Sequence, residues 1–145
     1  MKVIQVNKPG EIAIVEKPMP ADPGVGEVVV RIKAAGICGS DVHIFHGKKP
    51  FATYPRILGH EAAGEVVKTG AGVTNVKVGD HVAIDNVFSC GKCHACRIGR
   101  ANVCKSVKVL GVHIDGLFSE YVNLPADHLY VVPAELPWEL AATLE

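Results

Sequence analysis

The protein is a chain of 145 residues in which 15 Lys and Arg side chains balance 15 Asp and Glu side chains, so its formal net charge is zero. This length suits one domain with a substantial core, and the 48% apolar content argues against a disordered chain. The lack of a basic excess argues against a nucleic-acid-binding module. No apolar run approaches the roughly 18–20 residues that span a bilayer, and residues 1–20 have no signal-peptide core. We therefore expect a cytoplasmic protein with neither nucleic-acid nor membrane partners.

Short runs of alternating apolar and polar residues recur along the chain and predict β-strands. In chain order they are Val3–Val6, Glu11–Val15, Val28–Lys33, Gly64–Lys68, His81–Asp85, Glu120–Leu124 and Leu129–Val132. The clearest run places Val28, Val30 and Ile32 on one face and Arg31 and Lys33 on the other. Gly and Pro residues punctuate the runs, and many short strands with such spacing favour an all-β barrel or sandwich.

Two short helices are expected between these strands and after them. One begins at Ser40-Asp41, where either side chain can cap the first turn. The other begins near Pro137, carries Trp138 as a packing anchor, and continues through good helix formers to Glu145. Its pattern is still helical at the last residue, so we interpret this end as a boundary within a longer protein.

Four cysteines lie within fifteen residues in the pattern C-x2-C-x2-C-x7-C, namely Cys90, Cys93, Cys96 and Cys104. Clustered cysteines in a cytosolic chain hold metal more often than they form disulfides. Four thiolates complete a tetrahedral zinc site with no open position, which is a structural site. Ferredoxin-type iron–sulfur motifs place the fourth cysteine after three residues and follow it with Pro, whereas here the gap is seven and Lys105 follows. The sequence predicts a structural zinc in a lobe over about residues 88–106.

The fifth cysteine belongs to a second group of candidate ligands. Cys38 precedes Ser40, Asp41 and His43, and the pair His60-Glu61 follows 22 residues later. Taken singly, a cysteine after a strand is usually a small buried apolar residue, and a His-Glu pair is often a satisfied polar pair. Together they offer a thiolate, an imidazole and a carboxylate, an open three-ligand set typical of catalytic zinc. Asp41 could then orient His60, and Ser40 and His43 could carry a proton away from the metal.

These motifs together resemble one known family. The stretches Gly36–His43, Gly59–Gly64, Val78–Val82, Gly116–Tyr121 and Leu144-Glu145, with the four-cysteine lobe, are similar to the N-terminal GroES-like catalytic domain of zinc-dependent medium-chain alcohol dehydrogenases. The resemblance covers essentially the whole chain. Within that family it is strongest to the polyol and sugar-acid branch, including sorbitol-, threonine- and hexonate-type dehydrogenases and the starvation-sensing dehydrogenase-like proteins. It implies a mainly β fold, a GroES-like, partly open β-barrel with short helices and a zinc lobe.

The resemblance also implies roles for individual residues. Cys38 and His60 would ligate a catalytic zinc, with Glu61 as a third ligand or exchangeable neighbour. Glu145 falls where the polyol branch has a glutamate that reaches the metal directly or through water. Ser40 would take the proton of an alcohol substrate and pass it through the cofactor ribose towards His43. Two zinc ions per chain, and NAD or NADP in the full-length protein, are the cofactors implied.

The chain contains no G-x-G-x-x-G run, which a dinucleotide-binding domain would show after a strand. We therefore expect residues 1–145 to be a truncated catalytic domain, inactive alone, from a homo-oligomeric dehydrogenase that acts on a small-molecule alcohol. One alternative is a non-enzymatic, zinc-stabilised sensor or interaction module on the same fold. A zinc-free acyl or quinone reductase relative is disfavoured, because such proteins lack both the Gly-His-Glu motif and the cysteine lobe. Lys48, Lys49 and Arg56 could meet a substrate carboxylate, although such charges are more often simply solvated.

Overall fold

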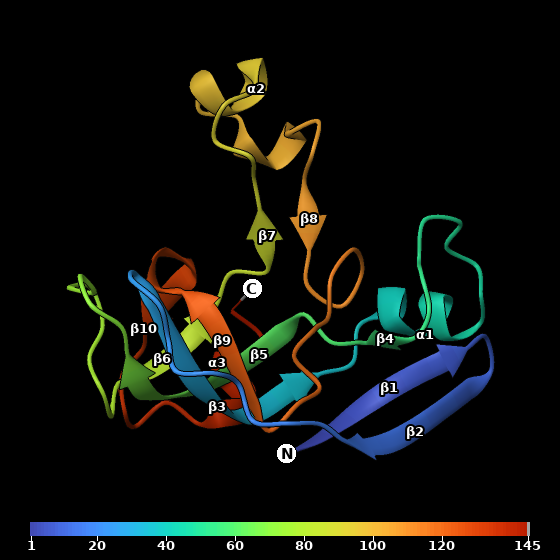
Figure 1. Ribbon diagram of the computed structural model, residues 1–145, viewed down its shortest axis with the longest axis horizontal. Helices are drawn as coiled ribbons and strands as arrows, with labels where there is room; N and C mark the ends of the chain where they lie inside the picture. The colour runs from blue at the N-terminus through green and yellow to red at the C-terminus, as the bar shows by residue number, and fades with distance from the viewer. Residues whose placement is uncertain (145) are drawn as a thin grey trace.

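The computed structural model describes residues 1–144, and its elements are mostly short β-strands (Figure 1). In chain order they are β1 (Lys2–Lys8), β2 (Glu11–Glu16), β3 (Glu27–Gly36), α1 (Gly39–Phe45), β4 (Arg56–Ile57), β5 (Glu61–Thr69), β6 (His81–Ile84), β7 (Val87–Phe88), α2 (His94–Arg97), η1 (Ala101–Val103), β8 (Lys108–Val109), β9 (Tyr121–Pro125), η2 (Ala126–His128), β10 (Leu129–Val131) and α3 (Trp138–Ala141). The η elements are single turns of 3-10 helix. None of the helices within residues 1–144 is long and apolar enough to cross a bilayer.

The largest sheet has the strand order β10-β6-β5-β3-β9, and each neighbouring pair is antiparallel. The alternation expected on β3 is present, because Val28 and Val30 are fully buried and Arg31 is exposed. A bulge between Val29 and Val30 interrupts the β3–β5 ladder, and bulges increase the local twist of a sheet. In the described chain, η2 rather than a ladder connects the edge strands β9 and β10. The sheet is therefore open, which agrees with the expected mainly β fold with short helices and a partly open barrel.

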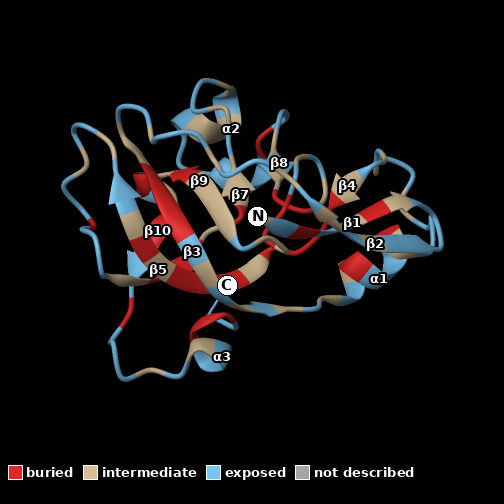
Figure 2. Ribbon diagram, turned by 60° about the horizontal axis from the view of Figure 1, so that its bottom comes forward, coloured by how far each residue is buried: buried red, intermediate tan, exposed pale blue. Residues whose placement is uncertain are grey.

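The main core lies against this sheet, and loop residues such as Leu110 and Leu117 complete it. Figure 2 shows buried residues concentrated on β3 and its neighbours, with exposed residues along β2 and the outer loops. On another face α3 packs Ala141 and Ala142 against Ala63 and Ala83. Trp138 lies against the same cluster and contacts the ring of His81 in a tilted arrangement, with 4.0 Å between ring centroids, so it is the predicted packing anchor.

A smaller sheet of order β2-β1-β4 packs beside α1. Val6 of β1, Ile44 of α1 and Leu58 after β4 form its buried cluster. This packing fixes α1 at the end of β3, and it brings the residues that precede β5 close to the first turn of α1. The smaller sheet thus determines where two segments of the second candidate metal site meet.

All seven strands expected from alternation are present, whereas the last helix is shorter than predicted. The alternation cannot reveal β4, β7 and β8, because a two-residue strand contains no period. The helix that was predicted to run to Glu145 ends at Ala141. Beyond it the Thr143 and Leu144 N–H groups bond to carbonyls three residues back, and Thr143 Oγ1 donates to the Leu140 carbonyl. The hydroxyl competes for a helical acceptor, which favours a turn over further α-helix.

Gly64 is required where β3 and β5 approach each other. A Cβ at this position would lie 2.3 Å from the Arg31 carbonyl oxygen and 2.7 Å from Val30 Cγ1. We expect Gly64→Ala to lower the free energy of unfolding by about 2–3 kcal/mol, because backbone cannot yield as a side chain can. Urea denaturation measures this, and Gly39→Ala is the matched control, since a Cβ there meets nothing within 4 Å. Equal stability of the two variants would contradict the prediction.

Candidate metal sites

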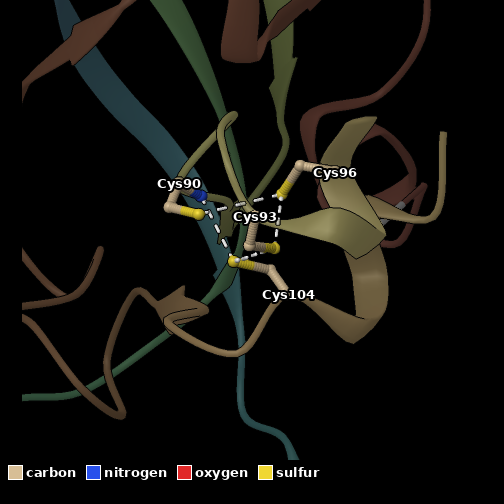
Figure 3. Close-up of side chains that lie close together, drawn as sticks. All are labelled: Cys90, Cys93, Cys96 and Cys104. Carbon is tan, nitrogen blue, oxygen red and sulfur yellow. Dashed lines mark hydrogen bonds between the residues drawn. The ribbon is translucent and has the colours of Figure 1, made fainter. Parts of the chain in front are cut away.

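The four-cysteine lobe projects from the body of the protein on the ribbon formed by β7 and β8 (Figure 1). Cys90 follows β7, Cys93 caps the N-terminus of α2, Cys96 lies within α2, and Cys104 follows η1. Because one helical turn separates Cys93 from Cys96 and η1 turns the chain back, the four sulfurs point towards one centre (Figure 3).

The spacing of these sulfurs fits a tetrahedral zinc ion. The Sγ–Sγ distances are 3.5 Å for Cys93–Cys96, 3.9 Å for Cys93–Cys104 and 4.0 Å for Cys90–Cys96. A tetrahedron with Zn–S bonds of about 2.3 Å has S–S edges of about 3.8 Å, whereas a disulfide needs about 2.05 Å. All four thiols are free. The lobe therefore has the geometry of a closed thiolate site and not of a disulfide pair.

Main-chain N–H groups stabilise the thiolate form of two of these cysteines. The N–H groups of Cys96 and Lys105 lower the pKa of the Cys93 thiol to about 6, and those of Lys92 and Cys93 lower the pKa of Cys90. Desolvation, followed by the neighbouring Cys93 sulfur, raises the pKa of Cys96 to about 11. Since thiolates are the metal-binding form, a metal that binds here at neutral pH must displace at least the Cys96 proton.

A second group of ligand atoms converges at the end of β3. Cys38 Sγ, a ring nitrogen of His60 and a Glu61 carboxylate oxygen all lie within 4.8 Å of one another. Cys38 is the N-cap of α1, Glu61 is the first residue of β5, and His60 immediately precedes it. The pairing of Gly36 with Glu61 in the β3–β5 ladder brings these segments together. One thiolate, one imidazole and one carboxylate form the donor set of an open zinc site.

The imidazole of His60 is buried and lies between two polar groups of α1. Its Nδ1 is 3.6 Å from Asp41 Oδ1, and its Nε2 is 3.2 Å from Ser40 Oγ. The Asp41 carboxylate also accepts the Cys38 and Gly59 N–H groups, at 2.9 and 3.1 Å. Asp41 therefore holds the chain on both sides of the site. Its carboxylate favours the tautomer with a proton on Nδ1, which leaves the Nε2 lone pair for Ser40 or a metal.

Gly36 leaves space for the Glu61 carboxylate. A Cβ at Gly36 would lie 2.5 Å from Glu61 Oε2, so any larger residue would displace the carboxylate from its present position. Because the two residues are cross-strand partners, the space exists only in the folded ladder. The sequence motif contains this glycine, but the motif alone does not show that the Glu61 carboxylate occupies the space beside it.

Other described residues that were candidates for the site lie outside this cluster. His43 is exposed on α1 and is not one of the converging ligand residues, and Glu145 lies outside the described residues. Arg56, considered as a contact for a substrate carboxylate, instead pairs with Asp115, with Nη1–Oδ1 at 3.3 Å. Lys49 lies over the ring of Phe51, which stacks on His113.

Asn86 is a site residue that sequence reasoning missed. It is buried, with 2% exposure, and its amide Nδ2 donates to the His60 carbonyl at 3.3 Å. It belongs to no motif, and a lone asparagine after a strand usually indicates a turn. Only the fold shows that it contacts the segment that carries a candidate ligand.

The fold thus combines a group of four thiols on a ribbon with a Cys–His–Glu group beside the main sheet, and these donor sets fit a closed and an open zinc site respectively. A family model, the alcohol dehydrogenase GroES-like domain, matches residues 24–134. The chain belongs to this family, and the resemblance seen in its motifs is confirmed.

Curated relatives match the chain over most or all of its length. The chain is 49% identical over 145 residues to the starvation-sensing protein RspB of Escherichia coli K12, covering all of this chain and 42% of RspB. It is 41% identical over 135 residues to L-galactonate-5-dehydrogenase of the same organism, and this match covers 93% of the chain and 39% of that relative. Among solved structures, the chain is similar to rspB from E. coli CFT073, a short chain alcohol dehydrogenase complexed with cofactor NADH. The TM-score is 0.89 at 46% identity, and the match covers 98% of this chain and 41% of the rspB chain. The chain therefore spans about two fifths of the length of these relatives.

Proposed function

We propose that residues 1–145 form the metal-binding catalytic domain of a zinc-dependent, NAD(P)-linked dehydrogenase that oxidises a secondary alcohol in a polyol, a sugar acid or a related substrate. The observation that carries this proposal is the convergence of Cys38, His60 and Glu61 within 4.8 Å beside the Ser40 hydroxyl. A purely structural metal site would have no reason to leave a coordination position open next to a hydroxyl.

Each residue of the site has a separate proposed role in the reaction. Zinc held by Cys38, His60 and Glu61 would supply Lewis-acid chemistry, which lowers the pKa of a substrate hydroxyl. Ser40, whose Oγ is 3.2 Å from His60 Nε2, would accept the proton that the substrate loses. Asp41, whose Oδ1 lies 3.6 Å from Nδ1, would orient the His60 ring. We assign His43 to the outer end of this proton path, since it is exposed on the same helix.

The hydride acceptor would bind to a part of the protein beyond these residues. A nicotinamide cofactor is the usual acceptor for alcohol oxidation, and the related rspB structure contains NADH. The two-fifths coverage of the relatives is compatible with a separate dinucleotide-binding domain. Homo-oligomerisation and a cytoplasmic location of the complete protein stay predictions from the sequence.

The test uses the full-length protein, expressed from its complete reading frame. Native mass spectrometry counts zinc per chain, and a screen of polyols and sugar acids with NAD and NADP measures substrate-dependent formation of the reduced cofactor. We expect two zinc ions per chain and turnover with at least one secondary alcohol. Residues 1–145 expressed alone should show no turnover.

Two results would overturn the proposal. If only the lobe holds zinc and no alcohol is oxidised, the non-enzymatic sensor or interaction module becomes the better interpretation. If residues 1–145 alone catalyse NAD(H)-dependent turnover, the assignment of the cofactor to another part of the protein is wrong.

A further inference from the structure

Asn86 stands between the zinc lobe and the open metal site. It follows β6 and immediately precedes β7, the strand that leads to Cys90. Its side chain is buried, with 2% exposure, although it is an amide. A buried amide is normally retained only where it makes specific hydrogen bonds, so its partners indicate what it does.

The main chain around Asn86 is held firmly on both sides. Its carbonyl accepts the Leu110 N–H at 3.1 Å, which ties it to the residue that follows β8. The preceding Asp85 donates its N–H to the His128 carbonyl at 2.8 Å, and Asp85 Oδ1 accepts the Val87 N–H at 2.9 Å. With the backbone fixed at the base of the ribbon, the amide of Asn86 becomes a rigid donor.

This donor acts on the main chain of His60 and not on its ring. Asn86 Nδ2 bonds to the His60 carbonyl, while Asp41 Oδ1 accepts the N–H of the preceding residue, Gly59. Two bonds from different parts of the chain therefore fix the backbone on either side of the His60 Cα. The direction of a side chain depends on the backbone that carries it, so both bonds determine where the imidazole points.

We propose that Asn86 is a positioning residue for the open metal site, holding the main chain of His60 so that the imidazole meets Cys38 and Glu61. This inference rests on the proposed metal-binding function of those three residues. Asn86 itself lies outside the converging ligand set. Removing groups that orient metal ligands typically weakens metal binding by 10–100-fold.

The experiment measures cobalt binding to the full-length protein after zinc has been exchanged. Co²⁺ in a four-thiolate site and Co²⁺ in a Cys–His–Glu site differ in their absorption spectra, so each site can be titrated separately in the same protein. Asn86→Leu keeps the approximate size of the side chain and removes the donor. We expect it to weaken cobalt binding at the Cys–His–Glu site at least tenfold and to leave the lobe within twofold of wild type.

Asn75→Leu is the matched control, because Asn75 also donates its amide to a main-chain carbonyl, that of Ala126 at 2.7 Å. It should change neither cobalt site. Should Asn86→Leu fail to fold, Asn86→Ser with its shorter donor takes its place. The increase in melting temperature on metal loading is then compared with that of wild type, which separates metal binding from intrinsic stability.

The outcomes distinguish this proposal from the one on which it rests. If wild type binds cobalt in both sites and the Asn86 variants match Asn75→Leu, the positioning role is wrong and the metal site stands. If wild type binds cobalt only in the lobe, the proposed catalytic metal site fails, and the positioning role fails with it.

Discussion

Cys104→Ser is expected to remove one of two zinc ions per chain and to lower the free energy of unfolding by more than about 4 kcal/mol, the range associated with loss of a metal site. Cys104 is the most buried of the four lobe cysteines, with 4% exposure. Its sulfur accepts the N–H groups of Cys90 and Ser106, both at 3.3 Å. The effect should be large because none of the apolar clusters formed by the described residues includes a residue of 89–107, so a shared metal must hold α2, η1 and the ribbon together.

Native mass spectrometry gives the zinc count, and urea denaturation with and without a chelator gives the stability. His94→Ala is the matched control, because His94 lies in the lobe, is exposed and is outside the four-sulfur cluster. It should retain both zinc ions. If Cys104→Ser also retained two zinc ions at unchanged stability, the lobe would not be a thiolate metal site.

His60→Ala is expected to reduce kcat/KM of the full-length protein by about 10³-fold or more while the lobe keeps its zinc. A bound metal typically contributes several kcal/mol of charge stabilisation to the transition state, and each 1.36 kcal/mol corresponds to a factor of ten in rate. His60 is buried, with 6% exposure, and its two ring nitrogens face Asp41 and Ser40. Alanine at this position removes a proposed zinc ligand. It also removes the imidazole that contacts Ser40, the proposed proton acceptor.

Steady-state kinetics with the best substrate from the screen measures this effect, alongside the zinc count of each variant. His94→Ala again serves as the control, with expected activity near that of wild type. If the His60→Ala protein kept its kcat/KM within tenfold of wild type, a role for His60 in the reaction would be excluded.

The two metal sites differ in how far the sequence alone could predict them. The four lobe cysteines lie within fifteen residues, so a short segment with two turns can bring their sulfurs together. The open site joins Cys38 to His60 and Glu61 across 22 residues. Its residues were proposed from their chemistry and from family resemblance. Their meeting within 4.8 Å depends on the β3–β5 ladder and on the packing of α1.

Strand prediction succeeded where local patterning was strong and failed where it was absent. Alternation located the long strands because one face of each packs on a shared core, as Val28 and Val30 do. The two-residue strands β7 and β8 are set by the ribbon that supports the lobe, and no periodicity could reveal them. The α3 helix ends early because the Thr143 hydroxyl bonds to the Leu140 carbonyl. Helix propensities averaged over the whole segment do not show the effect of this single residue.

The fold class, the family and the types of ligand residue could be predicted without coordinates, because alternation, short cysteine spacing and motif residues are all local properties of the chain. That Gly36 makes room for Glu61, and that Asn86 reaches the carbonyl of His60, becomes visible only in the folded chain. These contacts join segments that are far apart in the sequence. Their existence depends on strand register and on how the ribbon is anchored, and both are settled by packing across the whole domain.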